Sequence, residues 1–86
     1  MNINELIAIV KNKLEKEIVI QDLKIEDKSF LHKNHKGHKE GKFHLKLIIK
    51  SEELAKLTKI ASTKRVYGVL NLELKEYIHS IQILLN

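Results

Sequence analysis

The chain has 86 residues and no cysteine, and its 16 Lys and Arg against 11 Asp and Glu leave a formal net charge of +5. This length fits one small domain with a thin core, and we expect residues 1–86 to form a single domain. No apolar run reaches the roughly 18 residues that a membrane span needs, and the N-terminus lacks the pattern of a secretory signal, so we expect a soluble cytoplasmic protein. The lack of cysteine excludes disulfides, a cysteine nucleophile and thiolate metal ligands from this chain.

The positive charge is carried almost wholly by lysine, because Arg65 is the single arginine. Lysine binds phosphate as a point charge, whereas the arginine fork can clamp phosphate or read guanine through two hydrogen bonds. The charge favours acidic partners such as nucleic acid. A compositional bias toward Lys, Ile and Asn is the alternative explanation.

The first predicted element is a helix that begins after Asn2. Asn2 and Glu5 have the spacing of a capping box. About three turns of helical spacing follow, with apolar residues at Leu6, Ile7, Val10 and Leu14. Residues 18–25 are rich in β-branched side chains and predict a strand, with one face formed by Val19, Leu23 and Ile25.

Residues 28–42 lose the apolar pattern and predict a long loop rich in Lys and His. Compact domains rarely keep a loop of this length unless it has a function or is disordered. Residues 43–50 then predict the clearest strand of the chain, half buried, with its apolar face formed by Phe43, Leu45, Leu47 and Ile49.

Two helices and a strand complete the predicted order. Ser51 is expected to cap a helix whose apolar residues are Leu54, Leu57, Ile60 and Ala61. Ser62 or Thr63 is expected to break it, and a second helix follows with Val66, Val69, Leu70 and Leu74. Residues 78–85 predict the last strand. The order helix, strand, strand, helix, helix, strand predicts an α/β (α+β) fold with the helices on one face of a three-stranded mixed sheet.

The five histidines are the candidate ligands of this chain. His32, His35 and His38 are spaced by three in the predicted loop and can converge on an ion, although a solvated loop is the simpler interpretation. His44 opens a strand on its polar face and is expected to be exposed. His79 takes the first inward-facing position of the last strand, where burial favours the neutral imidazole that a metal needs. A histidine satisfied by bonds at the edge of the core is the alternative that its spacing favours.

Three stretches of the chain together resemble the BolA family. They are Lys-Phe-His-Leu-Lys-Leu-Ile-Ile-Lys-Ser at 42–51, Lys-Arg-Val-Tyr-Gly-Val-Leu at 64–70 and Ile-His-Ser-Ile at 78–81. The family pattern has Ser-His-Phe entering a strand, a Ser after it, a basic cluster before Val-Tyr and a final His-Ala-Leu. Asp-Lys-Ser at 27–29, followed by His32, is similar to the family's Asp-Glu-Ser entry into a loop that carries a His. The likeness covers residues 3–85.

The resemblance implies a BolA-like fold related to class II KH domains, and a partner. The partner is a monothiol glutaredoxin of the Cys-Gly-Phe-Ser type, with which BolA proteins share a bridging 2Fe–2S cluster. The resemblance makes His79 one cluster ligand and His32 the second, with His35 or His38 as substitutes. Glutathione and the glutaredoxin cysteine would supply the thiolates. The implied role is iron–sulfur cluster trafficking or iron and redox sensing, and the chain alone is expected to be a monomer or weak homodimer.

A DNA-binding transcriptional regulator is the alternative function, favoured by the positive charge and the KH-like order. Its weak candidate contacts are Lys59, Lys64 and Arg65. The Gly-x-x-Gly clamp of KH domains is missing, and Phe43 and Tyr67 are expected in the core, which leaves few aromatic side chains for base stacking. An enzyme is not expected, because the chain shows no nucleophile beside a base and no glycine loop that cradles phosphate.

The chain departs from the family pattern at two places that matter for these predictions. Ser-Thr-Lys at 62–64 stands where many members have Arg-His-Arg, which weakens any base readout by this helix. Lys56 stands where a Gly often follows the strand-to-helix turn, so the helix is expected to continue through Lys56.

Overall fold

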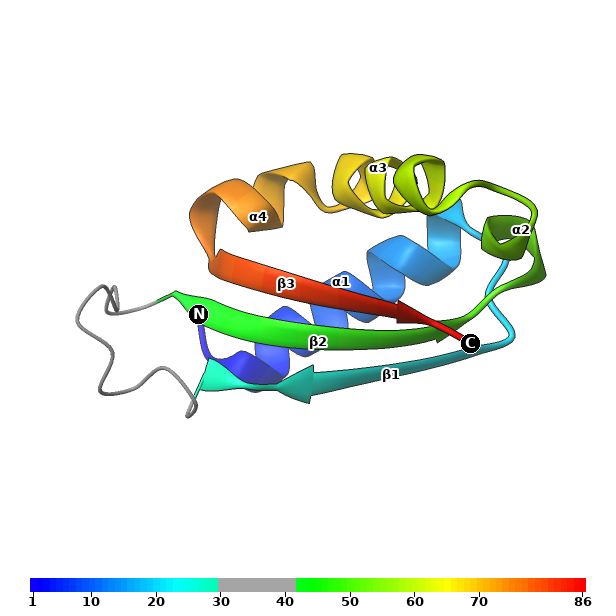
Figure 1. Ribbon diagram of the computed structural model, residues 1–86. Helices are drawn as coiled ribbons and strands as arrows, with labels where there is room; N and C mark the ends of the chain where they lie inside the picture. The colour runs from blue at the N-terminus through cyan, green and yellow to red at the C-terminus, as the bar shows by residue number, and fades with distance from the viewer. Residues whose placement is uncertain (30–41) are drawn as a thin grey trace.

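The computed structural model describes residues 1–29 and 42–86, and Figure 1 shows their arrangement. The elements are α1 (Ile3–Glu17), β1 (Asp22–Asp27), β2 (Phe43–Lys50), α2 (Glu52–Ala55), α3 (Lys59–Val69), α4 (Asn71–Glu76) and β3 (Ile78–Leu85). β1 pairs antiparallel with β2, and β2 pairs parallel with β3, so β2 is the central strand. The predicted α+β fold with a three-stranded mixed sheet is confirmed, and the short α4 is an addition to the predicted order.

α1 begins as the capping box predicts and ends later than expected. The N–H of Glu5 donates to Oδ1 of Asn2 at 2.8 Å, and Nδ2 of Asn2 donates to Oε1 of Glu5 at 2.8 Å. The helix then runs for 15 residues to Glu17. β1 consequently starts at Asp22 rather than at residue 18, and Val19 lies exposed in the connection instead of on a strand.

The core lies between the helices and one face of the sheet (Figure 1). β2 provides its centre with Leu45, Leu47 and Ile49. The helices cover these residues with Leu6, Val10, Leu14, Leu54, Val66 and Leu70. Each such side chain stabilises the fold by about 1.5–3 kcal/mol through burial. None of the described helices is long and apolar enough to cross a membrane.

None of the described helices covers the opposite face of the sheet (Figure 1). Glu26, Lys46 and Gln82 lie side by side there, one on each strand. This face therefore presents a row of polar side chains across the three strands.

α2 is a single turn that stops where continuation was predicted. Ser51 caps it as expected, because the N–H of Leu54 donates to Oγ of Ser51 at 3.1 Å. The helix ends at Ala55, and Lys56 is its C-cap, so the expected continuation through Lys56 is wrong.

The break between the two predicted helices lies at 56–58, not at Ser62 or Thr63. Thr58 has an extended backbone, and its Oγ1 accepts a hydrogen bond from the N–H of Ala61 at 3.1 Å. A side chain can cap a helix only from such a non-helical residue. Ser62 is instead buried inside α3, where its hydroxyl donates to the carbonyl of Lys59 at 3.0 Å.

Candidate functional site

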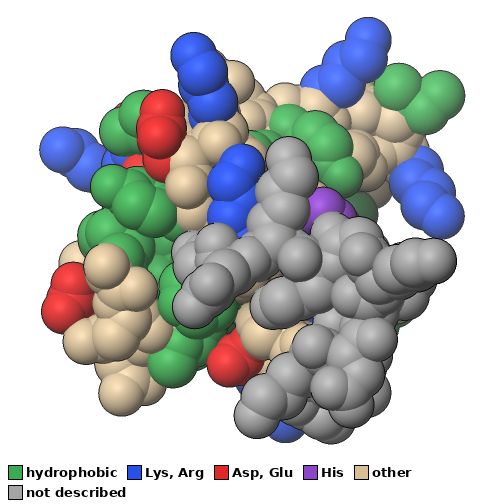
Figure 2. All heavy atoms as spheres, turned by 90° about the vertical axis from the view of Figure 1, so that its left-hand side faces the viewer, with side chains coloured by type: hydrophobic (Ala, Val, Ile, Leu, Met, Phe, Trp, Pro, Cys, Tyr) green, Lys and Arg blue, Asp and Glu red, His purple; other side chains and the backbone are tan. Residues whose placement is uncertain are grey.

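Two histidines meet at the end of the sheet where β2 and β3 begin. The ring centroids of His44 and His79 lie 4.8 Å apart with the planes at 60°, which is an edge-to-face contact. His44 is only 5% exposed, whereas His79 is exposed. Figure 2 views this end of the molecule, where a histidine side chain reaches the surface. One buried ring therefore supports a second ring that faces solvent.

An irregularity in strand register produces this pair. Phe43 faces Ile78 and His44 faces Ser80, so β3 has one extra residue, His79, at this point. Ile78 takes the buried position. The predicted inward position of His79 is therefore wrong, because simple alternation of side chains does not reveal a bulge, which re-aims them.

His44 is buried, contrary to the exposed position that its strand pattern predicts. Its backbone N–H donates to Oγ of Ser29 at 3.1 Å, and its carbonyl accepts from the N–H of Lys28 at 2.7 Å. Its ring Nδ1 shares a hydrogen bond with Oγ of Ser80 at 2.6 Å. These contacts come from the residues that follow β1 and from β3, so no pattern within residues 43–50 could have indicated them.

The described residues on both sides of the range 30–41 lie at this same end. Ser29 bonds to His44, and Nζ of Lys42 donates to the carbonyl of Lys75 in α4 at 3.3 Å. The range 30–41 lies outside the described residues and contains the predicted second ligand with its substitutes, His32, His35 and His38. Their role stays a prediction.

A hollow of about 360 Å³ lies beside His44 on the uncovered face of the sheet. Lys28 and Lys46 are among its lining residues. Desolvation alone would raise the pKa of the nearby Glu26, but Lys28 and Lys24 outweigh it and lower that pKa. Their ammonium groups lie 3.4 and 3.5 Å from the Glu26 carboxylate. The surface next to the histidines is therefore charged and polar.

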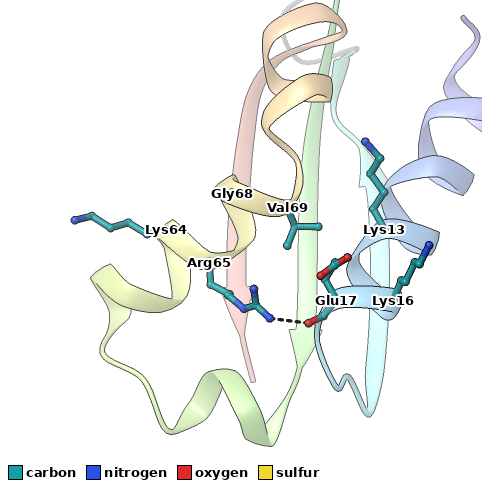
Figure 3. Close-up of a pocket in the computed structure, with 7 residues that line it drawn as sticks. All are labelled: Lys13, Lys16, Glu17, Lys64, Arg65, Gly68 and Val69. Carbon is teal, nitrogen blue, oxygen red and sulfur yellow. Dashed lines mark hydrogen bonds between the residues drawn. The ribbon is translucent and has the colours of Figure 1, made fainter.

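The predicted nucleic-acid contacts lie exposed on α3, but they do not form one cluster. A groove of about 580 Å³ separates α1 from α3, and Lys64 and Arg65 belong to its lining (Figure 3). Arg65 donates from Nη2 to the carbonyl of Glu17 at 2.7 Å and lies 3.8 Å from the carboxylate of Glu53. Lys64 points away from α1 in Figure 3. Lys59 lies at the start of α3 and does not line this groove.

α1 contributes Lys13 and Lys16 to the same groove (Figure 3). Nζ of Lys13 donates to Oε2 of Glu73 at 2.6 Å, and the Glu73 side chain is only 4% exposed. No local sequence pattern indicates this ion pair, because its residues are 60 positions apart. The pair connects α1 to α4. It also neutralises the charge of Lys13, so this lysine adds little to the positive charge of the groove.

The aromatic residues divide between core and surface. Phe43 packs against the core as predicted, but Tyr67 is 43% exposed on α3. Val66 and Leu70 occupy the inward face of that helix, one turn apart, and this turns Tyr67 outward. The expected burial of Tyr67 is therefore wrong.

The fold and this site define a small α+β domain that presents paired histidines at one end of a mixed sheet. Residues 14–86 match the model of the BolA-like protein family, and the chain belongs to that family. It is 32% identical over 75 residues to the "DNA-binding transcriptional regulator BolA" of Haemophilus influenzae, a match that covers 87% of this chain and 70% of that protein.

Solved structures share the whole architecture. The BolA domain of SufE1 from Arabidopsis thaliana matches with a TM-score of 0.78 and 27% identity, over 100% of this chain and 93% of that one. BolA1 from the same plant matches with a TM-score of 0.75 and 27% identity, over 91% and 86% of the two chains. The predicted BolA-like fold is confirmed by these similarities.

Proposed function

We propose that this chain pairs with a monothiol glutaredoxin of the Cys-Gly-Phe-Ser type and gives imidazole ligands to a 2Fe–2S cluster shared by the two proteins. The exposed His79 ring, backed by the buried His44 ring, is the observation that carries the proposal. A ligand to a cluster shared with another molecule must be open to solvent, and His79 is exposed. The chain would act in cluster trafficking or in iron and redox sensing, not as an enzyme.

The donor chemistry of the chain fits a shared site better than a closed one. The chain has no cysteine, so the thiolates must come from the glutaredoxin and glutathione. Within residues 1–29 and 42–86, no three His, Asp or Glu side chains are grouped to hold a metal ion. Structural metal sites in one chain usually need four ligands. Two imidazoles on one iron of such a cluster would raise its reduction potential relative to four thiolates.

His44 would act as a positioning residue for His79. Its ring contacts the His79 ring, and its Nδ1 is engaged by Ser80. An edge-to-face contact of this kind would favour one orientation of the His79 ring. The second ligand remains His32, with His35 and His38 as substitutes.

The test mixes the chain anaerobically with a reconstituted glutaredoxin of this type and glutathione. We expect a new visible circular dichroism spectrum and a heterodimer that retains iron during gel filtration. An unchanged spectrum with no comigrating iron would refute the proposal. Single alanine variants of the loop histidines then rank the second ligand: one of His32→Ala, His35→Ala or His38→Ala should lose the spectrum.

DNA binding is the second candidate, supported by the name of the Haemophilus relative and by the basic groove between α1 and α3. Lys16 and Lys64 are the groove lysines for which the described residues show no ion pair. Fluorescence anisotropy at about 0.15 M salt tests it, because phosphate contacts alone weaken steeply as salt rises. A transcriptional regulator must bind one DNA sequence more tightly than others at that salt concentration. Binding that does not depend on the DNA sequence and is lost as salt rises would be electrostatic attraction alone.

A further inference from the structure

The two edges of the sheet differ sharply in charge. Four of the six residues of β1 are charged, Asp22, Lys24, Glu26 and Asp27. β3 is longer, and none of its eight residues is Asp, Glu, Lys or Arg. Proteins commonly protect exposed strand edges with charges, prolines or bulges, because an open edge pairs readily with another strand. β1 carries that protection along its length, whereas β3 has its irregularity only at the first residues.

The outer edge of β3 is open along the part of the chain that the structure describes. There β3 pairs with β2 alone, so its other side offers backbone N–H and C=O groups. The side chains agree with this, because most of the strand is exposed: His79, Ser80, Gln82, Leu84 and Leu85.

Apolar surface gathers along the same edge. Leu84 and Leu85 are 41% and 39% exposed, and Leu57 is 42% exposed. All three line a hollow of about 510 Å³ between α3 and the end of β3. Lys59 is the one charged residue of that lining among the described residues. Covering these leucines would remove apolar area from water, which favours association.

We propose that a second copy of this chain pairs with β3, antiparallel and edge to edge, about a two-fold axis. With the axis at Gln82, Ile81 opposes Ile83 of the second copy, and side chains on the core side of one sheet continue those of the other. No like charges meet across the strands, and cross-strand apolar pairs of this kind are favourable. The two three-stranded sheets join into one continuous sheet whose two outer edges are the charged β1 strands. Because those edges do not favour further pairing, the assembly closes at two copies.

The salt dependence of association distinguishes this contact from attraction to an acidic molecule. Each copy carries a net charge of +5, so the copies repel each other over long range. Salt screens that repulsion. The dimer should therefore strengthen as salt rises, whereas a complex between this edge and an acidic partner would weaken.

Sedimentation of the full chain alone over a range of concentrations, at low and high salt, tests the proposal. Gln82→Lys places like charges on both sides of the axis, and Asn12→Lys adds the same charge on the exposed surface of α1. We expect a monomer–dimer equilibrium that salt strengthens. Gln82→Lys should lower the association constant about fivefold, as like charges across strands do, while Asn12→Lys should stay within about twofold of the wild type. Thermal unfolding of both variants checks that they fold.

Amide hydrogen exchange locates the contact. At high protein concentration, exchange should slow along β3 and stay unchanged along β1. A wild-type chain that is monomeric throughout, equal weakening by both variants, or slowing confined to α3 or β1 would overturn the proposal. None of these experiments involves a cluster or a glutaredoxin. A result that overturns the dimer therefore leaves the proposed function untouched.

Discussion

The buried ring of His44 meets the exposed ring of His79 edge-to-face, with centroids 4.8 Å apart. His44 is fixed from two sides, since its N–H bonds to Ser29 and its Nδ1 bonds to Ser80. His79 follows Ile78, which anchors the start of β3 in the core. This ring contact favours one orientation of the exposed imidazole, which suits a ligand for a partner's metal.

Replacing His44 separates its two contacts. His44→Ala removes the ring contact and the bond to Ser80, and we expect a loss of about 2 kcal/mol in unfolding free energy. His44→Phe keeps a ring against His79 and should lose less. Urea unfolding measures the stability, and visible circular dichroism of the glutaredoxin mixture measures the cluster. The signal per folded molecule should fall in His44→Ala and partly recover in His44→Phe. If both variants abolish it equally, His44 is a ligand and the positioning role is wrong.

The ion pair between Lys13 and Glu73 predicts an asymmetric double-mutant cycle. Lys13→Met leaves a carboxylate that is 4% exposed without its partner and should cost about 2 kcal/mol. Glu73→Gln leaves a lysine that is 40% exposed and can turn to water, so it should cost less. The double variant Lys13→Met with Glu73→Gln should lose less stability than the sum of the two single losses. Additive losses in chemical denaturation would show that the pair is not coupled.

Arg65 and Lys64 are adjacent in sequence and should behave differently. Arg65→Ala removes a donor to the last carbonyl of α1 and should cost about 1 kcal/mol of stability. Lys64→Ala should leave stability within about 0.5 kcal/mol. If the groove binds nucleic acid, Lys64→Ala should reduce the salt slope of that binding by about one phosphate contact. Unchanged stability in Arg65→Ala would contradict the capping role.

The boundaries of the fold were only partly predictable from the sequence. Signals that act within a few residues were sufficient: Asn2 with Glu5 began α1, and alternation from Phe43 to Lys50 located β2. The helix break was misplaced, because Ser62 is as good a cap by residue type as Thr58. Its burial in α3 depends on how that helix packs, which no local pattern contains.

The candidate site was predicted by resemblance and located by tertiary contacts. The family pattern singled out His79, but periodicity predicted a buried His79 and an exposed His44. The exposure of both depends on the register between β2 and β3, where His44 faces Ser80 and His79 is extra. Register across strands distant in sequence is a property of the assembled sheet, so the reversal could not be seen in the chain.

Gly68 offers a test that bears on stability and on the groove together. It lies in α3, and a Cβ built there meets no atom within 4 Å. Gly68→Ala should therefore stabilise the protein by about 1 kcal/mol, measured by thermal unfolding, because alanine is the better helix former. A lower stability would mean that the α1–α3 groove is tighter than the structure indicates.

The proposed function requires that an imidazole nitrogen of His79 binds iron in the complex with a glutaredoxin. Pulsed EPR of the reduced complex, prepared with isotopically labelled histidine in this chain, measures that nitrogen directly. We predict a histidine nitrogen coupling that Gln82→Ala retains and from which His79→Ala loses one component. A wild-type spectrum without any histidine coupling, or one that His79→Ala leaves unchanged, would show that His79 does not bind the iron.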